Sequence, residues 1–368
     1  MLLPLSPAAA TQAVLWGGLA IGLALGAVAQ ATRFCTMGAL ADWFGFGAPG
    51  RLLMWLLAVA VAACGSMALI EAGWLDATQT LAWSPRFIPA SYLVGGTLFG
   101  FGMVLASGCP QRSLVKAGAG SLKALVTLLV AGLAAQMTLR GVLAGPRVSG
   151  LDVWAWQLAG PQDLGSILGG AAGIGAATMR RAVLALLLIV SAVLLWRQRV
   201  AMESGHWVGG TLVGLLVPLA WGLTGHIGFL PEHPETLEAA WLGTQSHRPE
   251  ALSFAAPLAQ GLDLLTLWSD RNTSASFGVL VALGVVLGSA TSALLRREFQ
   301  IESFRTAPDL GNHLVGGALM GFGGVTAMGC SIGQGVSGLS LLSAGACLAV
   351  TGIAAGAWLA LRWQTWRA

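Results

Sequence analysis

Charged side chains are scarce in this chain. They make up 9% of its residues, against roughly 25% in ordinary soluble domains. Apolar residues make up 56%, so too little charge is present to cover the surface of a soluble protein. The apolar runs are continuous and lack an alternation of period two, which disfavours a membrane β-barrel. The composition therefore predicts an all-α, polytopic membrane protein.

Sequence motifs for nucleotides and metals are also lacking. No Walker sequence occurs, and the Gly-Phe-Gly triplets at 100–102 and 321–323 lie inside apolar stretches instead of opening a phosphate-binding loop. The five cysteines form no CxxC pair and no Cys/His zinc spacing. The net charge of +4 is spread thinly along the chain, so we expect no nucleic-acid partner. We also expect no metal, no cofactor, no catalytic residue and no enzymatic activity.

One 18-residue segment occurs twice. Residues 92–109 read YLVGGTLFGFGMVLASGC, and residues 313–330 read HLVGGALMGFGGVTAMGC. Twelve positions are identical at a constant offset of 221 residues, and both copies end in Gly-Cys. The apolar stretches are short and rich in glycine, whereas a helix that crosses a bilayer needs about 20 apolar residues. We therefore expect broken helices that bring related thiols to one shared site.

Nine apolar stretches are candidates for membrane spans. They cover roughly residues 13–31, 51–72, 91–108, 120–139, 181–196, 206–224, 275–295, 312–329 and 338–361. Four spans thus precede a single connecting span, and four follow it. Because one span separates the two groups, the second group must cross the membrane in the opposite sense. The sequence therefore predicts an inverted repeat of two four-helix halves with broken helices at Gly-Cys.

The boundaries of this repeat and its orientation follow from the same pattern. We expect a first repeat over 1–140, a connector with one span over 141–204 and an inverted second repeat over 205–368, all within one integral membrane domain. We expect the first apolar block to be retained as a span. The positive-inside rule places twelve basic residues inside and seven outside when the N-terminus is periplasmic and the C-terminus cytoplasmic. The long connectors at 140–180 and 225–274 are expected to be interfacial helices or a lid.

Cys109 lies at the first predicted helix break. Gly108 allows a tight turn, and Pro110 cannot continue the preceding helix. A helix that restarts there would place the thiol beside free backbone N–H groups, which attract anions. Gln111 and Arg112 follow; Arg112 is either a cytoplasmic anchor or a group that draws an anion to the inner mouth.

Cys330 repeats this break with different neighbours. Gly329 precedes it, as Gly108 precedes the first thiol, but Ser331 replaces the proline. Ser331 and Gln334 are neutral hydrogen-bond donors available near the thiol. The two halves are therefore related but not equivalent.

A third candidate thiol, Cys35, ends the first span beside Arg33. Its expected counterpart in the second half is near Ile227, where no cysteine occurs. Cys64 and Cys347 lie among alanines within smooth apolar stretches, so we interpret them as packing residues.

The segments RFCTMGAL (33–40), SGCPQRSLVK (107–116) and MGCSIGQG (328–335), with WGLTG at 221–225, resemble those of the YeeE/YedE family of bacterial inner-membrane proteins. The resemblance implies thiosulfate uptake across the cytoplasmic membrane, with Cys35, Cys109 and Cys330 as the pathway thiols. It also implies an hourglass-shaped inverted repeat with a thin central septum, and a TusA-like sulfurtransferase as a cytoplasmic partner. Some relatives are linked to selenium or to other sulfur species.

We interpret the three thiols as a relay for a soft dianion. Neutral S–H groups and helix-end N–H groups bind an anion moderately, and efficient conduction requires serial sites of this kind. Three alternatives stay open: transport of another sulfur or selenium species, a membrane thiol–disulfide oxidoreductase, and a transporter of copper(I). The lack of CxxC argues against the oxidoreductase, and the few Met and His residues along the spans argue against copper.

Overall fold

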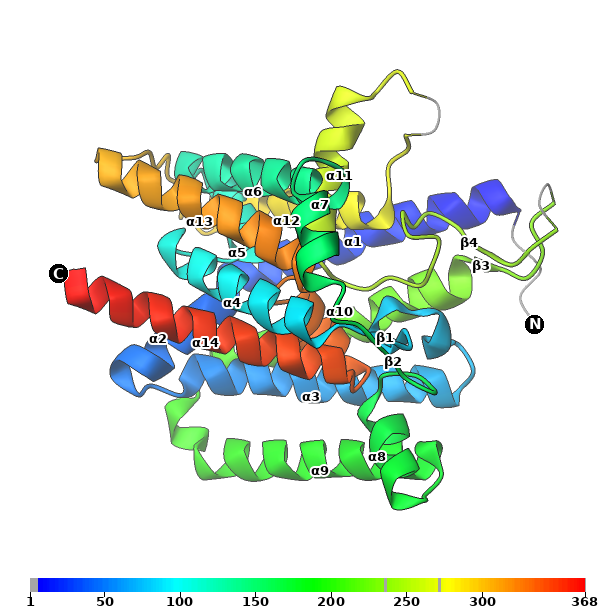
Figure 1. The fold of residues 1–368 in the computed structure, drawn as a ribbon. Coiled ribbons are helices and arrows are strands. Elements are labelled where there is room, and N and C mark those ends of the chain that lie inside the picture. Colours follow the sequence, from blue (N-terminus) through cyan, green and yellow to red (C-terminus); the bar gives the residue numbers. More distant parts are fainter. Residues whose placement is uncertain (1–5, 235–236, 271–272, 368) are drawn as a thin grey trace.

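The computed structural model describes residues 6–234, 237–270 and 273–367. Long helices run mainly along one direction, and the two ends of the chain lie at opposite ends of the bundle (Figure 1). In the described residues, paired strands are limited to two small antiparallel sheets of two-residue strands. The prediction of an all-α, polytopic membrane protein is confirmed.

The first half contains four long helices and two short helices that each follow a cysteine. Its elements are α1 (Pro7–Thr32), α2 (Thr36–Phe46), α3 (Gly50–Glu71), η1 (Ala77–Gln79), η2 (Leu81–Trp83), β1 (Arg86–Phe87), α4 (Pro89–Leu105), α5 (Pro110–Gly118) and α6 (Leu122–Arg140). The connector contains α7 (Ala144–Pro146), η3 (Arg147–Leu151), β2 (Trp156–Gln157), α8 (Leu164–Ala172), α9 (Ala176–Arg197) and η4 (Arg199–Ala201).

The second half repeats this order with a longer insertion. Its elements are α10 (Ser204–Gly222), η5 (Leu223–Ile227), β3 (Phe229–Leu230), β4 (Ala240–Trp241), α11 (Ala255–Thr266), α12 (Phe277–Leu295), α13 (Ala307–Thr326), η6 (Gly333–Gly338) and α14 (Ala344–Arg367).

All nine predicted spans coincide with helices, but the count of apolar spans is lower. Among the described residues, eight helices are long and apolar enough to cross a membrane. The ninth is α13, which has 20 residues and carries Asp309 in its first turn. Its polar first turn contributes to the C-side cavity described below, which explains why it is less apolar than its repeat copy, α4.

The helices of the two halves pack in reciprocal pairs. Helix α1 packs along α12 and α10 along α3, while α4 packs along α14 and α13 along α6. In chain order α1 matches α10, α3 matches α12, α4 matches α13 and α6 matches α14. The α1–α12 pair of helices therefore corresponds to the α10–α3 pair, and the α4–α14 pair corresponds to the α13–α6 pair. Matching helices run in opposite directions (Figure 1), which is the arrangement expected of an inverted repeat. The proposed domain boundaries stay a prediction.

The repeated helices α4 and α13 cross at glycines that repeat through the 221-residue offset. A Cβ on Gly95 would lie 2.9 Å from the carbonyl oxygen of Gly323, and one on Gly323 would lie 2.5 Å from that of Gly95. Gly102 and Gly316 face each other in the same way, at 2.7 and 2.6 Å. Only glycine permits so close an approach of two backbones. Gly102 and Gly323 each lie three residues before the last residue of their helix.

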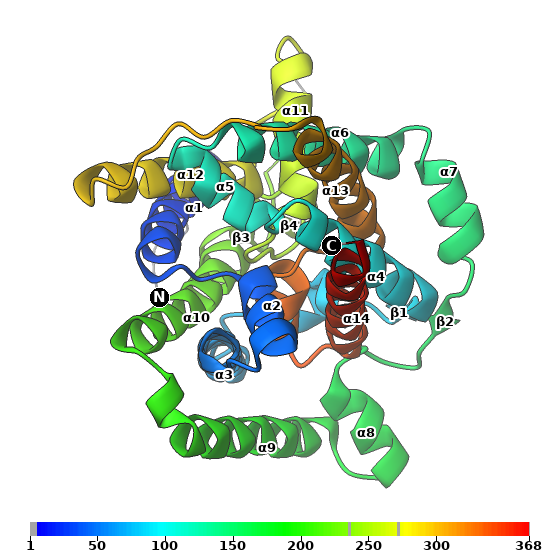
Figure 2. The same cartoon turned by 90° about the vertical axis from the view of Figure 1, so that its left-hand side faces the viewer.

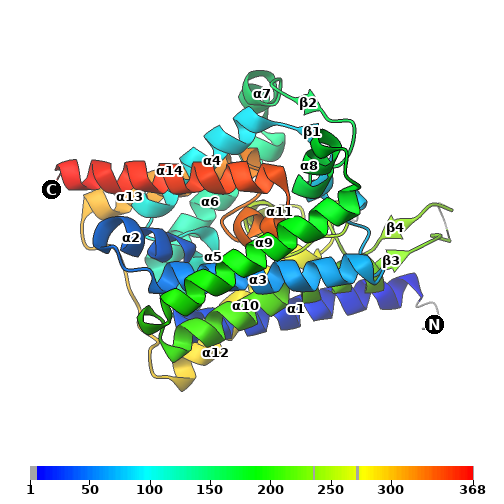
Figure 3. The same cartoon turned by 90° about the horizontal axis from the view of Figure 1, so that it is seen from below.

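Helix α9 lies outside this bundle, next to α3 (Figures 2 and 3). In its most apolar stretch only 11% of the residues are buried. Arg180, near its start, binds the buried Asp163 at 3.0 Å and lies 4.2 Å above the ring of Trp83. These contacts explain how the connector accommodates Arg180 on the expected outer side, where the positive-inside rule predicts fewer basic residues.

Candidate functional site

The three candidate thiols follow the same kind of turn. Each cysteine comes two residues after a residue with left-handed backbone geometry, which ends the preceding helix. These residues are Arg33 (φ 56°) before Cys35, Ser107 (φ 53°) before Cys109 and Met328 (φ 60°) before Cys330. The predicted helix breaks at both Gly-Cys sites are therefore present, and the first span ends in the same way.

The position of the left-handed residue corrects one expectation. We expected Gly108 to take the tight turn, but the positive φ belongs to Ser107. The N–H of Ser107 donates to the carbonyl of Val104, at 3.1 Å, and that of Gly108 to Met103, at 2.8 Å. These are the two hydrogen bonds of a Schellman motif, in which the residue before Gly108 is left-handed. The turn before Cys330, at Met328 and Gly329, has the same two bonds.

Each thiol lies at the start of the next helical segment. The sulfur of Cys35, the N-cap of α2, accepts from the N–H of Gly38 at 3.3 Å. That of Cys330 accepts from Gly333 at 3.4 Å and from Phe254 at 3.3 Å. Because the sulfurs accept backbone N–H groups, their own S–H protons remain available to donate.

The structure brings the three thiols together. Cys35 and Cys330 lie within electrostatic range of the thiol of Cys109, and Ser331 lies beside it. Cys109 and Cys330 are fully buried, and Cys35 is 6% exposed. Within the described residues, no group of three or more His, Cys, Asp or Glu side chains could hold a metal ion. Cys64 faces outward on α3, which corrects its interpretation as a packed residue, and Cys347 is half-buried.

The long connector of the second half enters the bundle beside these thiols. Leu252 and Phe254 are fully buried, and Ser337 donates to the carbonyl of Leu252 at 2.8 Å. Phe254 is the N-cap of α11, as Cys35 is the N-cap of α2, and α11 contacts α6 and α12 as α2 contacts α14 and α3. The counterpart of Cys35 is therefore Phe254, and the expectation of a counterpart near Ile227 is wrong.

The other predicted site residues have mixed roles. Pro110 begins α5, and the Gln111 side chain is fully buried without a hydrogen-bond partner in the described chain. The guanidinium of Arg112 donates to the carbonyl of Ala29, at 3.4 Å. Arg33 is exposed at the end of α1.

Gln334 is already engaged: its side-chain amide donates to the carbonyl of Ala327, at 2.8 Å. This contact satisfies a carbonyl at the end of α13. Ser331 is 1% exposed and makes no well-directed hydrogen bond within the described chain. Of the two neutral donors predicted beside Cys330, Gln334 thus binds a backbone carbonyl, and Ser331 lies next to the thiol of Cys109.

A cavity of about 200 Å³ lies at the end of the bundle where α1 begins; we call it the N-side cavity. It reaches Met328, Gly333 and Gln334, which flank Cys330. Its lining is mostly apolar and includes neutral polar side chains such as Tyr92, Gln260 and Gln334, and Glu250 contributes the one carboxyl group of the described lining. Burial raises the pKa of Glu250 above its ordinary value, although hydrogen bonds from Ser246 and the nearby His247 act in the opposite direction.

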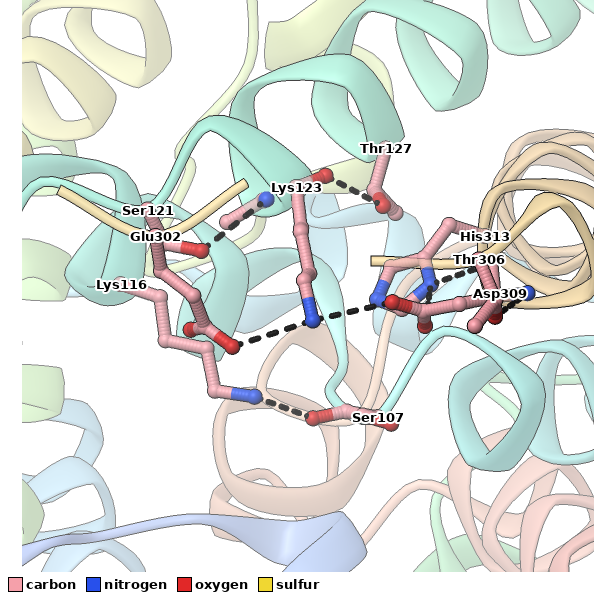
Figure 4. A network of polar contacts seen from close by, with 10 residues as sticks. Ser107, Lys116, Ser121, Lys123, Thr127, Glu302, Thr306, Asp309 and His313 are labelled. Carbon is pink, nitrogen blue, oxygen red and sulfur yellow. Dashed lines mark hydrogen bonds and ion pairs between the residues drawn. The ribbon is translucent and has the colours of Figure 1, made fainter. Parts of the chain in front are cut away.

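The opposite end of the bundle holds a smaller cavity of about 100 Å³, which we call the C-side cavity. Lys123 binds Glu302 at 3.1 Å and Asp309 at 2.9 Å, and so joins α6 to α13 (Figure 4). Lys116 donates to the carbonyl of Ser107 at 2.6 Å, on the turn that precedes Cys109. Within the described chain Lys116 makes no ion pair. This cavity therefore contains two basic side chains, Lys116 and Lys123, together with the carboxylates of Glu302 and Asp309.

Sequence reasoning did not find several of these groups. Glu250 and Phe254 lie in the long insertion of the second half, where the residue that corresponds to Cys35 is not a cysteine, and Lys116 is one of the basic residues that the positive-inside rule places on the inner side. The sequence contains no pattern that would have placed Glu250, Phe254 and Lys116 near the three thiols.

Together, the crossing repeats, the buried thiols and the two opposed cavities define a helical membrane protein with three buried thiols near the crossing of its two halves. Comparison with known families agrees with this class: a family model described as sulphur transport matches residues 31–359. The chain belongs to this family, and the resemblance to YeeE/YedE proteins is confirmed.

Two curated relatives are similar over most of their length. The chain is 28% identical to the thiosulfate transporter TsuA of Escherichia coli (strain K12) over 344 residues, which cover 87% of this chain and 86% of the relative. It is 25% identical to the thiosulfate transporter TsuA of Spirochaeta thermophila over 356 residues, which cover 94% of this chain and 97% of the relative. The similarity therefore includes both halves and the connector.

Proposed function

We propose that this protein takes up thiosulfate across the cytoplasmic membrane of a bacterium. The observation that carries this proposal is the position of three buried thiols at three equivalent helix ends, between two cavities at opposite ends of the bundle. Membership of the sulphur transport family and the names of both relatives support it.

The chemistry of the thiol cluster suits this substrate. Thiosulfate is a dianion with one soft terminal sulfur and three hard oxygens. Three S–H groups held by backbone N–H donors interact with the soft sulfur without binding the whole ion too tightly to release it. Transport through a series of moderate sites is faster than release from one strong site. The thiols thus act as a series of neutral binding sites between the two cavities.

The charges of the two cavities suggest a direction. The described lining of the N-side cavity contains no basic side chain and one carboxyl group whose neutral form burial favours, whereas Lys116 and Lys123 line the C-side cavity beside Glu302 and Asp309. An anion that passes the thiols would therefore meet basic side chains on the C side only. We propose that the N-side cavity opens to the periplasm and the C-side cavity to the cytoplasm. On the cytoplasmic side a TusA-like sulfurtransferase would accept sulfur from the transported thiosulfate.

The test is uptake of ³⁵S-labelled thiosulfate into vesicles that contain the purified protein. Cys109→Ala and Cys330→Ala should each abolish uptake, because each removes one of these binding sites. Cys64→Ala and Cys347→Ala are the matched controls, since neither thiol borders a helix break, and both should keep wild-type uptake. Wild-type rates in both Cys109→Ala and Cys330→Ala, at equal amounts of folded protein, would reject the proposal.

Competition by unlabelled anions identifies the substrate class. Thiosulfate and a selenium analogue should compete, whereas sulfate should not, because sulfate has no soft terminal atom for the thiols. Strong competition by sulfate would indicate a general oxyanion transporter. A disulfide between two of the three thiols during turnover would instead favour the oxidoreductase.

A further inference from the structure

One further cavity, of about 210 Å³, lies between α2, α3 and α14, and we call it the lateral cavity. Most of its wall is formed by Ala39 and Leu40 of α2, Leu52 of α3, and Ile353 and Ala354 of α14. No charged side chain of the described residues lines it. Because an apolar cavity excludes water and binds apolar molecules, the lining points to a hydrocarbon ligand.

The lateral cavity faces the bilayer. Helices α2, α3 and α14 all belong to segments that are long and apolar enough to cross a membrane. Helix α2 lies between α3 and α14 (Figure 2), and within the described residues these two helices do not pack along each other. Helix α9 flanks α3 but does not pack along α14. On the cavity wall, Leu40, Leu52, Trp55, Val350 and Ala354 are only partly buried. The cavity is therefore accessible from the side of the bundle, where lipid chains are the neighbouring molecules.

In the second half, α11 occupies the corresponding space. The backbones of Ile353 on α14 and Ala131 on α6 are each approached by a glycine of the duplicated segment. These two glycines are related by the 221-residue offset, so Ala131 corresponds to Ile353, and the next residue, Gly132, corresponds to Ala354. A Cβ on Gly132 would lie 2.9 Å from the side chain of Leu262 on α11. The chain itself thus fills in one half the space that stays open in the other.

Smaller side chains on α2 account for this difference. With Phe254 as the counterpart of Cys35, Leu258 of α11 corresponds to Ala39 of α2, which lines the lateral cavity. Protein interiors are normally close-packed, and walls without a partner lose their dispersion contacts. In the first half these contacts are therefore supplied from outside the chain, and the bilayer offers hydrocarbon chains.

We propose that the lateral cavity binds one acyl chain of a phospholipid, which enters from the bilayer between α3 and α14. A hydrocarbon chain has no polar group to desolvate, so an apolar space suits it. A helix of a partner protein, at about 10 Å in diameter, is too large for a space of this volume. The cavity also reaches Thr36, Ser331 and Gly335, so the bound chain supports the segments that follow two of the three thiols. This inference does not depend on which ion the protein transports.

The test uses the full chain in vesicles of phosphatidylcholine that carries a photoreactive diazirine on one acyl chain. After illumination, mass spectrometry of the peptides identifies the labelled residues. Ala39, Ser331 and Gly335 line the cavity but are buried, so an acyl chain reaches them only through it. We expect labels on at least one of these three residues, in addition to labels on exposed positions of α14 such as Leu359.

Two neighbouring positions of α14 give matched variants. Ala354 lines the cavity, whereas Ala355 is exposed on the outside of the helix. Ala354→Leu should lower the yield of the buried labels severalfold, because the longer side chain fills the space. Ala355→Leu adds the same atoms elsewhere and should be labelled like the wild type. Added phosphatidylcholine should also raise the thermal midpoint of the lipid-depleted wild type and of Ala355→Leu more than that of Ala354→Leu.

Labels on exposed positions of α14 without any label on Ala39, Ser331 or Gly335 would overturn the lipid site. Unchanged labelling of the buried residues in Ala354→Leu would overturn it as well. If Ala354→Leu does not fold, Ala39→Leu fills the same space from α2 and gives the same comparison. The labelling does not involve thiosulfate, so the lipid site and the proposed function fail separately.

Discussion

The crossing of α4 and α13 can be tested by adding one methyl group. In Gly323→Ala the new Cβ would lie 2.5 Å from the carbonyl oxygen of Gly95 and 2.5 Å from the backbone nitrogen of Phe99. Ordinary contact begins at 3.4 Å, so the two helices must separate locally by about 0.9 Å. Both opposing atoms belong to the backbone of α4, and neither can rotate away as a side chain would.

This separation has a cost in stability and in function. Overpacking of this kind costs about 1–3 kcal/mol, whereas alanine is favoured over glycine within a helix by about 1 kcal/mol. Gly311→Ala on the same helix gains only the helix preference of alanine and creates no clash, because no atom lies within 4 Å of its Cβ position. The difference between the two variants therefore isolates the clash, and we expect about 1–3 kcal/mol.

Unfolding of the purified protein gives the stability difference, and vesicle uptake gives the function. Gly323→Ala should be less stable than Gly311→Ala and should transport poorly, because α4 and α13 end at the turns that hold Cys109 and Cys330. Gly311→Ala should transport like the wild type. Equal stability and equal uptake of the two variants would refute the close crossing.

Three further changes test other features. Glu250→Gln should make uptake independent of pH, whereas wild-type uptake should fall as the pH rises through the raised pKa of Glu250, because the ionised carboxyl repels a dianion; a wild-type profile that stays flat would exclude this role. Ser107→Val should lower the thermal midpoint, because a β-branched residue is strained in the left-handed conformation. Gly108→Ala should lower the midpoint less. A larger loss in Gly108→Ala than in Ser107→Val would mean that Gly108 makes the turn. Lys123→Met should lower the midpoint at low salt and less at high salt, since it removes ion pairs to Glu302 and Asp309; a salt-independent change would point to packing instead.

Much of the architecture could be predicted from the sequence, because membrane spans require long apolar runs and an internal repeat restricts how they are arranged. The two copies that end at Cys109 and Cys330 indicated both helix breaks, and the length of the first apolar run placed Cys35 at the end of the first span. The eight apolar helices and the family match agree with these expectations. The prediction succeeded where one local pattern determines one element.

It failed where distant segments meet. The left-handed residue could not be located from Gly108 alone, because the hydrogen bonds of the Schellman motif decide which residue turns. Phe254 could not be matched to Cys35 from the sequence, because the long insertion after α10 places Phe254 further along the second repeat than Cys35 lies along the first. The position of Thr36, Trp55 and Ser331 around one cavity depends on the packing of α2 against α3 and α14, which no short stretch of sequence encodes.

The unequal charge of the two cavities has a consequence for how the protein behaves in a cell. Small anions in the compartment that faces Lys116 would compete for that mouth, while the same anions on the other side would meet no basic side chain of the described lining. We expect added phosphate to inhibit from one face only, and an oriented preparation would show which. The rate of transport would then depend on the concentration of small anions in that compartment.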